Sequence, residues 1–100
     1  MQFDHIALEV DSIEEGSIWY QKNMFAEIEY KDESWCLLKI GNAKVALVLK
    51  DMHPSHFAFK VDSKDKLGSI NKHRDGSLYN YITDPWGNTA EFIYYPKEKN

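Results

Sequence analysis

The sequence predicts an α+β protein built from two related halves, of which the second is shorter. Residues 56–63 repeat residues 5–12 position by position, with a histidine first, alternating apolar residues, a valine and then Asp-Ser. The chain also closes on two segments rich in aromatic and β-branched residues, joined by the turn sequence Asp-Pro-Trp-Gly-Asn at 84–88. The repeat and the terminal hairpin together indicate two strand-rich modules in one fold.

The first half is expected to contain a strand, a helix and three further strands. Residues 3–10 alternate as a strand does, and a helix over about 12–23 is indicated by Ser12, which can cap its first turn. Glu14 and Glu15 follow, where the helix dipole favours anions. Three strands are then expected at residues 26–30, 34–40 and 43–49. Alternation places Ile6, Leu8 and Val10 on one face of the first strand and His5, Ala7 and Glu9 on the other.

The second half is expected to restart this order and then fall short of it. Residues 56–63 match residues 5–12, so a strand followed by Asp-Ser is expected again, and residues 64–71 can form a short helix. Few residues remain before the last hairpin, so the strand expected between them is stunted or missing. In the hairpin turn, Pro85 fixes φ and Gly87 accepts the positive φ of a tight reversal. The strands of this hairpin are expected at residues 78–83 and 89–95.

Composition and charge exclude several classes of function. One hundred residues suffice for one domain, expected over 1–100 with modules at about 1–51 and 52–100. Twelve basic residues against sixteen acidic ones leave a net charge of −4, so no basic face is expected for nucleic acid. No apolar run approaches the roughly 20 residues of a membrane span, and the N-terminus enters a strand without a signal-like segment. The single cysteine, Cys36, excludes an internal disulfide and a cysteine-based zinc cluster, and a cytoplasmic protein is expected.

Three residues of metal-ligand type stand at strand positions. His5 and His56 are equivalent in the repeated strand, and Glu91 is a carboxylate inside the last strand, where it is unfavourable unless something binds it. A single strand histidine is more often structural, and a single glutamate in a terminal strand usually lies at an edge. Two imidazoles and one carboxylate on separate strands are, however, the ligands of a facial triad. Such a site holds Fe(II), Mn(II), Ni(II) or Zn(II) and leaves positions open for water and substrate, as catalytic sites do.

The chain resembles the vicinal oxygen chelate superfamily, which includes glyoxalases, bleomycin and fosfomycin resistance proteins and extradiol dioxygenases. The resemblance covers nearly the whole chain and lies in residues 3–10, 56–61, 73–77 and 81–91. It implies two βαβββ modules, the second shortened here, that form a curled mixed sheet around a divalent metal with helices on the outer face. Carried over position by position, the family's metal ligands fall on His5, His56 and Glu91.

One family ligand position differs in this sequence. Some members use a fourth ligand on the fourth strand of the first module, and the matching residue here is Ala46, which cannot bind a metal. The resemblance therefore favours a three-ligand site of the dioxygenase or fosfomycin-resistance type over the four-ligand site of glyoxalase I. Extradiol dioxygenases are normally much longer chains.

Four other side chains are candidates for the chemistry. Tyr79 and Tyr81 share a strand face that the family pattern points toward the metal, where they could bind a substrate oxygen or position an acid; the alternative is ordinary aromatic packing. Glu91 and Tyr81 are the candidate catalytic residues. Arg74 could bind an anionic substrate or simply be solvated. Glu9 shares the face of His5 and could support it or act as a base, unless it forms an edge salt bridge. Two further histidines, expected in loops, are assigned no role: His53 and His73.

The sequence supports two functions of different classes. The first is a small metal-dependent enzyme, whose ion acts as a Lewis acid on a small molecule bearing neighbouring oxygens; lyase, isomerase, thiol-transferase and dioxygenase reactions all fit. The second is a metal-free protein that sequesters an aromatic or cationic molecule, as bleomycin-resistance proteins do. A homodimer is expected, because a chain this short exposes sheet edges and aromatic surface. The metal site could form within one chain or by exchange of modules between two.

Overall fold

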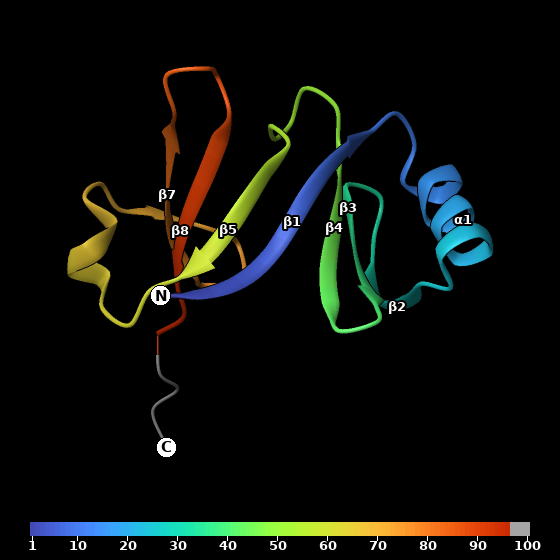
Figure 1. Ribbon diagram of the computed structural model, residues 1–100, viewed down its shortest axis with the longest axis horizontal. Helices are drawn as coiled ribbons and strands as arrows, with labels where there is room; N and C mark the ends of the chain where they lie inside the picture. The colour runs from blue at the N-terminus through green and yellow to red at the C-terminus, as the bar shows by residue number, and fades with distance from the viewer. Residues whose placement is uncertain (97–100) are drawn as a thin grey trace. The chain divides into compact units, whose positions relative to one another are not determined.

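In the computed structural model, which describes residues 1–96, eight strands form one mixed sheet accompanied by one α-helix and one short 3-10 helix (Figure 1). The elements are β1 (Gln2–Val10), α1 (Ile13–Met24), β2 (Glu27–Lys31), β3 (Trp35–Ile40), β4 (Ala43–Leu49), β5 (His56–Lys60), the 3-10 helix η1 (Lys64–Leu67), β6 (Asn71–Lys72), β7 (Leu78–Thr83) and β8 (Thr89–Tyr94). The strand order is β2-β3-β4-β1-β5-β8-β7-β6. This order confirms the predicted α+β class and the mixed sheet.

The chain divides into two compact units. The N-terminal unit is His5–His56, and the C-terminal unit is Phe57–Asn100 together with Met1–Asp4. The strands β1 and β5 therefore contribute residues to both units. Within the described residues, no helix has the length and apolar character that crossing a membrane requires.

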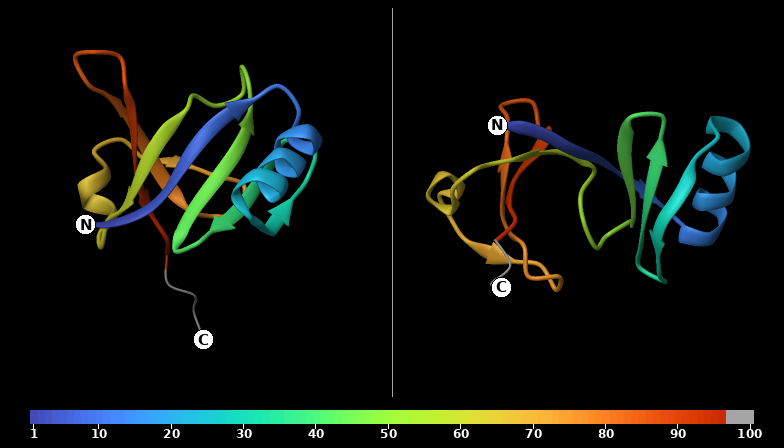
Figure 2. Two further views of the ribbon diagram at one scale, coloured as in Figure 1. Left: turned by 45° about the vertical axis from the view of Figure 1, so that its right-hand side comes forward. Right: turned by 90° about the horizontal axis from the view of Figure 1, so that it is seen from below.

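In the N-terminal unit, the sheet has one face covered by α1 and one face that α1 does not reach. β1 runs parallel to β4, and β3 pairs antiparallel with both β2 and β4. Figure 2 shows α1 along one side of β2, β3 and β4. Residues Ile13, Ala26, Cys36, Leu38, Val45 and Leu47 form the buried cluster beneath it, with Leu8 and Val10 packed against them. Ala7, Ala46 and Val48 form a second cluster with Trp35 and Leu37. The alternation predicted for the first strand is therefore confirmed.

The helix begins and ends where local chemistry directs it. The side chain of Ser12 caps the first turn by accepting a hydrogen bond from the backbone N–H of Glu15 at 3.2 Å. Phe25 ends the helix in the left-handed conformation with φ of 57°. Gly16 faces the sheet, and a Cβ there would lie 3.2 Å from Cδ1 of Leu47 and 3.3 Å from Cγ1 of Val10. The glycine therefore allows the helix to approach the sheet closely.

In the C-terminal unit, the predicted terminal hairpin is confirmed. β7 and β8 pair antiparallel, and Oδ1 of Asp84 accepts hydrogen bonds from the backbone N–H groups of Trp86 and Asn88 in the turn. Gly87 has the positive φ, 88°, that the turn was expected to need. The strand predicted to be stunted is β6, with two residues. The helix predicted over 64–71 is shorter than expected, because η1 stops at Leu67 and Gly68 follows with φ of 79°.

Candidate functional site

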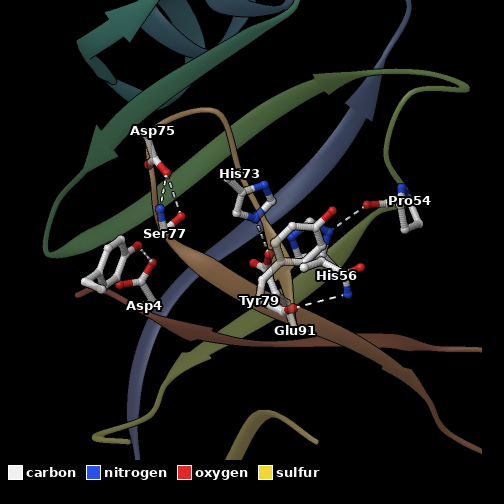
Figure 3. Close-up of polar contacts among 10 residues, drawn as sticks. Asp4, Pro54, His56, His73, Asp75, Ser77, Tyr79 and Glu91 are labelled. Carbon is white, nitrogen blue, oxygen red and sulfur yellow. Dashed lines mark hydrogen bonds and ion pairs between the residues drawn. The ribbon is translucent and has the colours of Figure 1, made fainter. Parts of the chain in front are cut away.

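The two histidines at repeated positions lie side by side in the N-terminal unit. His5 lies in β1 and His56 at the start of β5, and their ring centroids are 5.6 Å apart with an interplanar angle of 73°. Nδ1 of His56 lies 2.7 Å from the carbonyl oxygen of Pro54 (Figure 3). A carbonyl only accepts hydrogen bonds, so Nδ1 carries the hydrogen, and in the neutral ring Nε2 carries the lone pair. Metal-binding histidines are typically oriented in this way.

The face of β1 that carries His5 continues as an apolar surface. By alternation, Ala7 shares the face of His5, and Ala7 pairs in register with Ala46 of β4. Both alanines are buried. The position at which the resemblance places the fourth metal ligand of some family members therefore holds a methyl group in an apolar setting.

Glu91 is a buried carboxylate in the C-terminal unit. It lies in β8, is 2% exposed, and its Oε2 is 2.8 Å from Nε2 of His73 (Figure 3). His73 was assigned no role from the sequence. His73 immediately precedes the turn sequence Arg-Asp-Gly-Ser and lies two residues after Asn71, which pairs with Tyr79 of β7. That turn sequence was the available signal that the segment containing His73 folds back against β7.

Tyr79 and Tyr81 lie on the same face of the β7–β8 pair as Glu91. Tyr81 is the register partner of Glu91 across the β7–β8 pair, and Tyr79 that of Ile93. The ring of His73 stacks on Tyr79 with centroids 3.7 Å apart and an angle of 11°, and Tyr79 meets Tyr81 edge-on at 5.2 Å. Burial raises the pKa of Tyr81 well above its usual range, and the charge of Glu91 and the nearby Tyr79 add to the effect. Tyr81 is therefore a neutral phenol that can donate a hydrogen bond.

Glu9 and Arg74 are placed at the surface. Oε1 of Glu9 accepts a hydrogen bond from the backbone N–H of Ser55 at 3.2 Å, and the N–H of Glu9 donates to Oγ of Ser55 at 3.0 Å. This reciprocal pair fastens the connector that precedes β5. Glu9 also borders a surface depression of about 530 Å³, lined by Glu9, Val10, Asp11, Ser12, Glu15, Gly16 and Lys50. This depression contains none of the proposed metal ligands. Arg74 is exposed in the turn after β6.

Comparison with known proteins identifies the fold. No protein-family model matches the sequence, and no curated protein matches it. Among solved structures, methylmalonyl-CoA epimerase from Mycobacterium tuberculosis aligns over 96% of this chain and 89% of its own, with a TM-score of 0.75 and 16% identity. A Streptomyces coelicolor methylmalonyl-CoA epimerase in complex with 2-nitronate-propionyl-CoA aligns over 97% and 99%, with a TM-score of 0.77 and 14% identity. A glyoxalase/bleomycin resistance protein/dioxygenase superfamily member from Vibrio splendidus 12B01 aligns over 94% and 100%, with a TM-score of 0.72 and 15% identity. The chain therefore has the vicinal oxygen chelate fold that its motifs predict.

Proposed function

We propose that the chain is a small metal-dependent enzyme of the vicinal oxygen chelate type, with His5, His56 and Glu91 as ligands of a divalent ion. The observation that carries the proposal is the adjacency of the two imidazoles, which are far apart in sequence and have ring centroids 5.6 Å apart. The hydrogen bond from Nδ1 of His56 to Pro54 supports Nε2 as its ligating atom. Glu91, at 2% exposure, is a carboxylate in a setting where charge must be compensated. The donor set therefore fits Fe(II), Mn(II), Ni(II) or Zn(II).

An ion in this position would supply Lewis-acid chemistry toward a substrate oxygen. The side chains of the protein would bind the substrate and exclude water. Tyr81, a neutral phenol beside Glu91, is a donor for a substrate oxygen on which negative charge develops. The apolar face with Ala7 and Ala46 would exclude water from the reacting atoms. Ala46 would also leave free the coordination position that a fourth protein ligand would fill.

The substrate is proposed to be a small molecule with oxygens on neighbouring atoms. Lyase, isomerase, thiol-transferase and dioxygenase reactions are the candidate classes. The epimerases among the structures of the same fold are the reason to assay isomerase chemistry first. Tyr79 and Arg74 are proposed to contact the substrate, with Arg74 suited to an anionic group because guanidinium binds carboxylate or phosphate in bidentate fashion.

A metal-free binding protein is the second candidate function. It is favoured by the contact of Glu91 with His73, which gives the carboxylate a partner other than a metal. It is also favoured by the aromatic cluster in which His73 stacks on Tyr79 and Tyr79 meets Tyr81 edge-on, since these rings could bind a flat aromatic ligand. This candidate differs from the enzyme in one measurable respect, because its ligand binding would be insensitive to a chelator.

Metal analysis separates the two candidates. Protein purified without a metal-affinity tag would be analysed for bound metals and then titrated with Zn²⁺, Mn²⁺ and Ni²⁺ after chelator treatment. We expect about one equivalent of tightly bound ion, and Glu91→Gln, which keeps the shape of the side chain, should weaken affinity at least about tenfold. His53→Gln, at a histidine outside the proposed ligands, is the matched control. Absence of metal uptake by the wild-type protein, or unchanged affinity in Glu91→Gln, would refute the metal site.

We also propose that the protein is a homodimer. β2 and β6 stand at the two ends of the strand order, so within residues 1–96 each has one edge that no other strand of the sheet pairs with. A second copy would cover such edges. Light scattering coupled to size-exclusion chromatography measures the mass directly, and a mass of one chain at micromolar concentration would refute the proposal.

A further inference from the structure

His73 is held in place by its own segment of the chain. Its backbone N–H donates to the carbonyl of Ser77 at 2.9 Å, and its carbonyl accepts from the N–H of Gly76 at 3.0 Å. Oδ1 of Asp75 accepts hydrogen bonds from both the backbone N–H and the hydroxyl of Ser77, at 2.8 and 2.6 Å. The turn over 73–77 is therefore closed at several points, and it fixes the backbone from which the imidazole projects.

The ring of His73 is fixed independently of the backbone. It lies flat on Tyr79, with centroids 3.7 Å apart and planes 11° from parallel. Tyr79 lies in β7, which is paired with β8 on its other side. The imidazole plane is therefore set by a strand of the sheet, before any contact with Glu91 is considered.

The contact with Glu91 extends from this fixed ring into a buried site. Nε2 of His73 is 2.8 Å from Oε2 of Glu91, and the side chain of His73 is 25% exposed while that of Glu91 is 2% exposed. When the carboxylate of Glu91 is ionised it only accepts hydrogen bonds, and Nε2 of His73 then carries the hydrogen and donates it. A glutamate side chain has three rotatable bonds, and the hydrogen bond from His73 at its end restricts the positions that the carboxylate can take.

We propose that His73 is a positioning residue that orients the Glu91 carboxylate in the metal-free protein. We further propose that this orientation prepares the carboxylate to bind the ion, a second part of the inference that rests on the function proposed above. A carboxylate offers about four lone-pair sites on two oxygens, so a hydrogen bond to His73 and ligation of a metal are compatible. Carboxylates that bind metals are commonly hydrogen-bonded in this way to a second residue. The alternative is that His73 and the metal compete for Glu91. Removal of the imidazole would weaken metal binding if His73 positions Glu91 and would strengthen metal binding if His73 competes for it.

Two substitutions separate the hydrogen bond from the stack. His73→Phe keeps an aromatic ring to lie on Tyr79 and removes the donor. His73→Gln keeps an N–H donor of similar reach to Nε2 and removes the ring. Each would be combined with Glu91→Gln, and unfolding in urea would be measured with a chelator present. We expect the effects of His73→Phe and Glu91→Gln on stability to be non-additive, because His73→Phe removes the donor of this bond and Glu91→Gln removes the negative charge that strengthens it.

Zn²⁺ affinity then tests the second part. We expect His73→Phe to bind Zn²⁺ about 10–100-fold more weakly than the wild type, as loss of an orienting partner typically does, and His73→Gln to restore most of the affinity. Additive stability effects of His73→Phe and Glu91→Gln would overturn the inference whether or not metal binds. Equal or tighter Zn²⁺ binding by His73→Phe would overturn it in favour of competition. Non-additive stabilities in a wild-type protein that binds no metal would refute the proposed enzyme function while supporting the role of His73 in holding Glu91.

Discussion

Gly16 gives the sharpest test of the packing between α1 and the sheet. A glycine inside a helix normally costs about 1 kcal/mol relative to alanine, so Gly16→Ala would stabilise a helix whose surface was open at this point. Here the new methyl group would lie 3.2 Å from Cδ1 of Leu47 and 3.3 Å from Cγ1 of Val10. Carbon atoms attract best at about 3.5–4.0 Å, so both neighbours must move.

Of these two neighbours, Leu47 has little room to move. Leu47 is 0% exposed and lies in β4 between β3 and β1, and Val10 pairs with Leu49 in the parallel ladder. Inserting a methyl group into packing of this kind typically costs about 1–3 kcal/mol. Over most of the range of this packing cost, the cost exceeds the gain in helix propensity. We therefore expect Gly16→Ala to lower the free energy of unfolding by about 1 kcal/mol.

Urea denaturation followed by tryptophan fluorescence measures this change. The control is the same substitution in a Leu47→Val background, which removes the Cδ1 atom that the methyl group meets. There the penalty of Gly16→Ala should shrink. Stabilisation of the wild-type background by about 1 kcal/mol, as for an exposed helix position, would refute the close contact of α1 with β4.

Three further predictions test the helix cap at Ser12, the partly buried phenol of Tyr81 and the face that carries Ala46. Ser12→Ala should cost about 1 kcal/mol because it removes the acceptor for the N–H of Glu15; an unchanged urea midpoint would contradict this cap. The pKa values of Tyr81 and Tyr95 are raised, chiefly by burial, so the folded state favours the neutral phenols; their contribution is constant below the unfolded value of about 10 and stability should fall as the pH rises above it. Absorbance titration at alkaline pH should show a group of tyrosines that ionises late, and Tyr81→Phe should reduce its amplitude. An unchanged amplitude in Tyr81→Phe would contradict the raised pKa of Tyr81. Ala46→Glu buries a carboxylate and should lower the melting temperature in the presence of a chelator. Adding Zn²⁺ should raise the melting temperature of this variant by more than that of the wild type. A melting temperature that Zn²⁺ does not restore would argue against a ligand position at residue 46.

Local chemistry explains which elements could be predicted from the sequence. The cap at Ser12, the turn with Gly87 and the alternation of β1 each depend on residues within a few positions of one another. The repeat extended this reach, since equivalent positions in equivalent strands predicted that His5 and His56 would come together, and their rings do. The extent of η1 was not predictable in the same way, because residues 64–71 carry no strong helical pattern and Gly68 interrupts them.

The partners of individual side chains were decided by the tertiary structure. His73 looked like a loop histidine, and only the pairing of the two-residue strand β6 with β7 brings its ring onto Tyr79 and its Nε2 to Glu91. Glu9 likewise finds Ser55 across 46 positions of sequence. The sequence by itself determined the strand pattern, the fold class and which residues are candidate metal ligands, because these follow from residue type and periodicity. Which hydrogen bonds those residues form depends on distances between segments remote in sequence, and those distances exist only once the chain has folded.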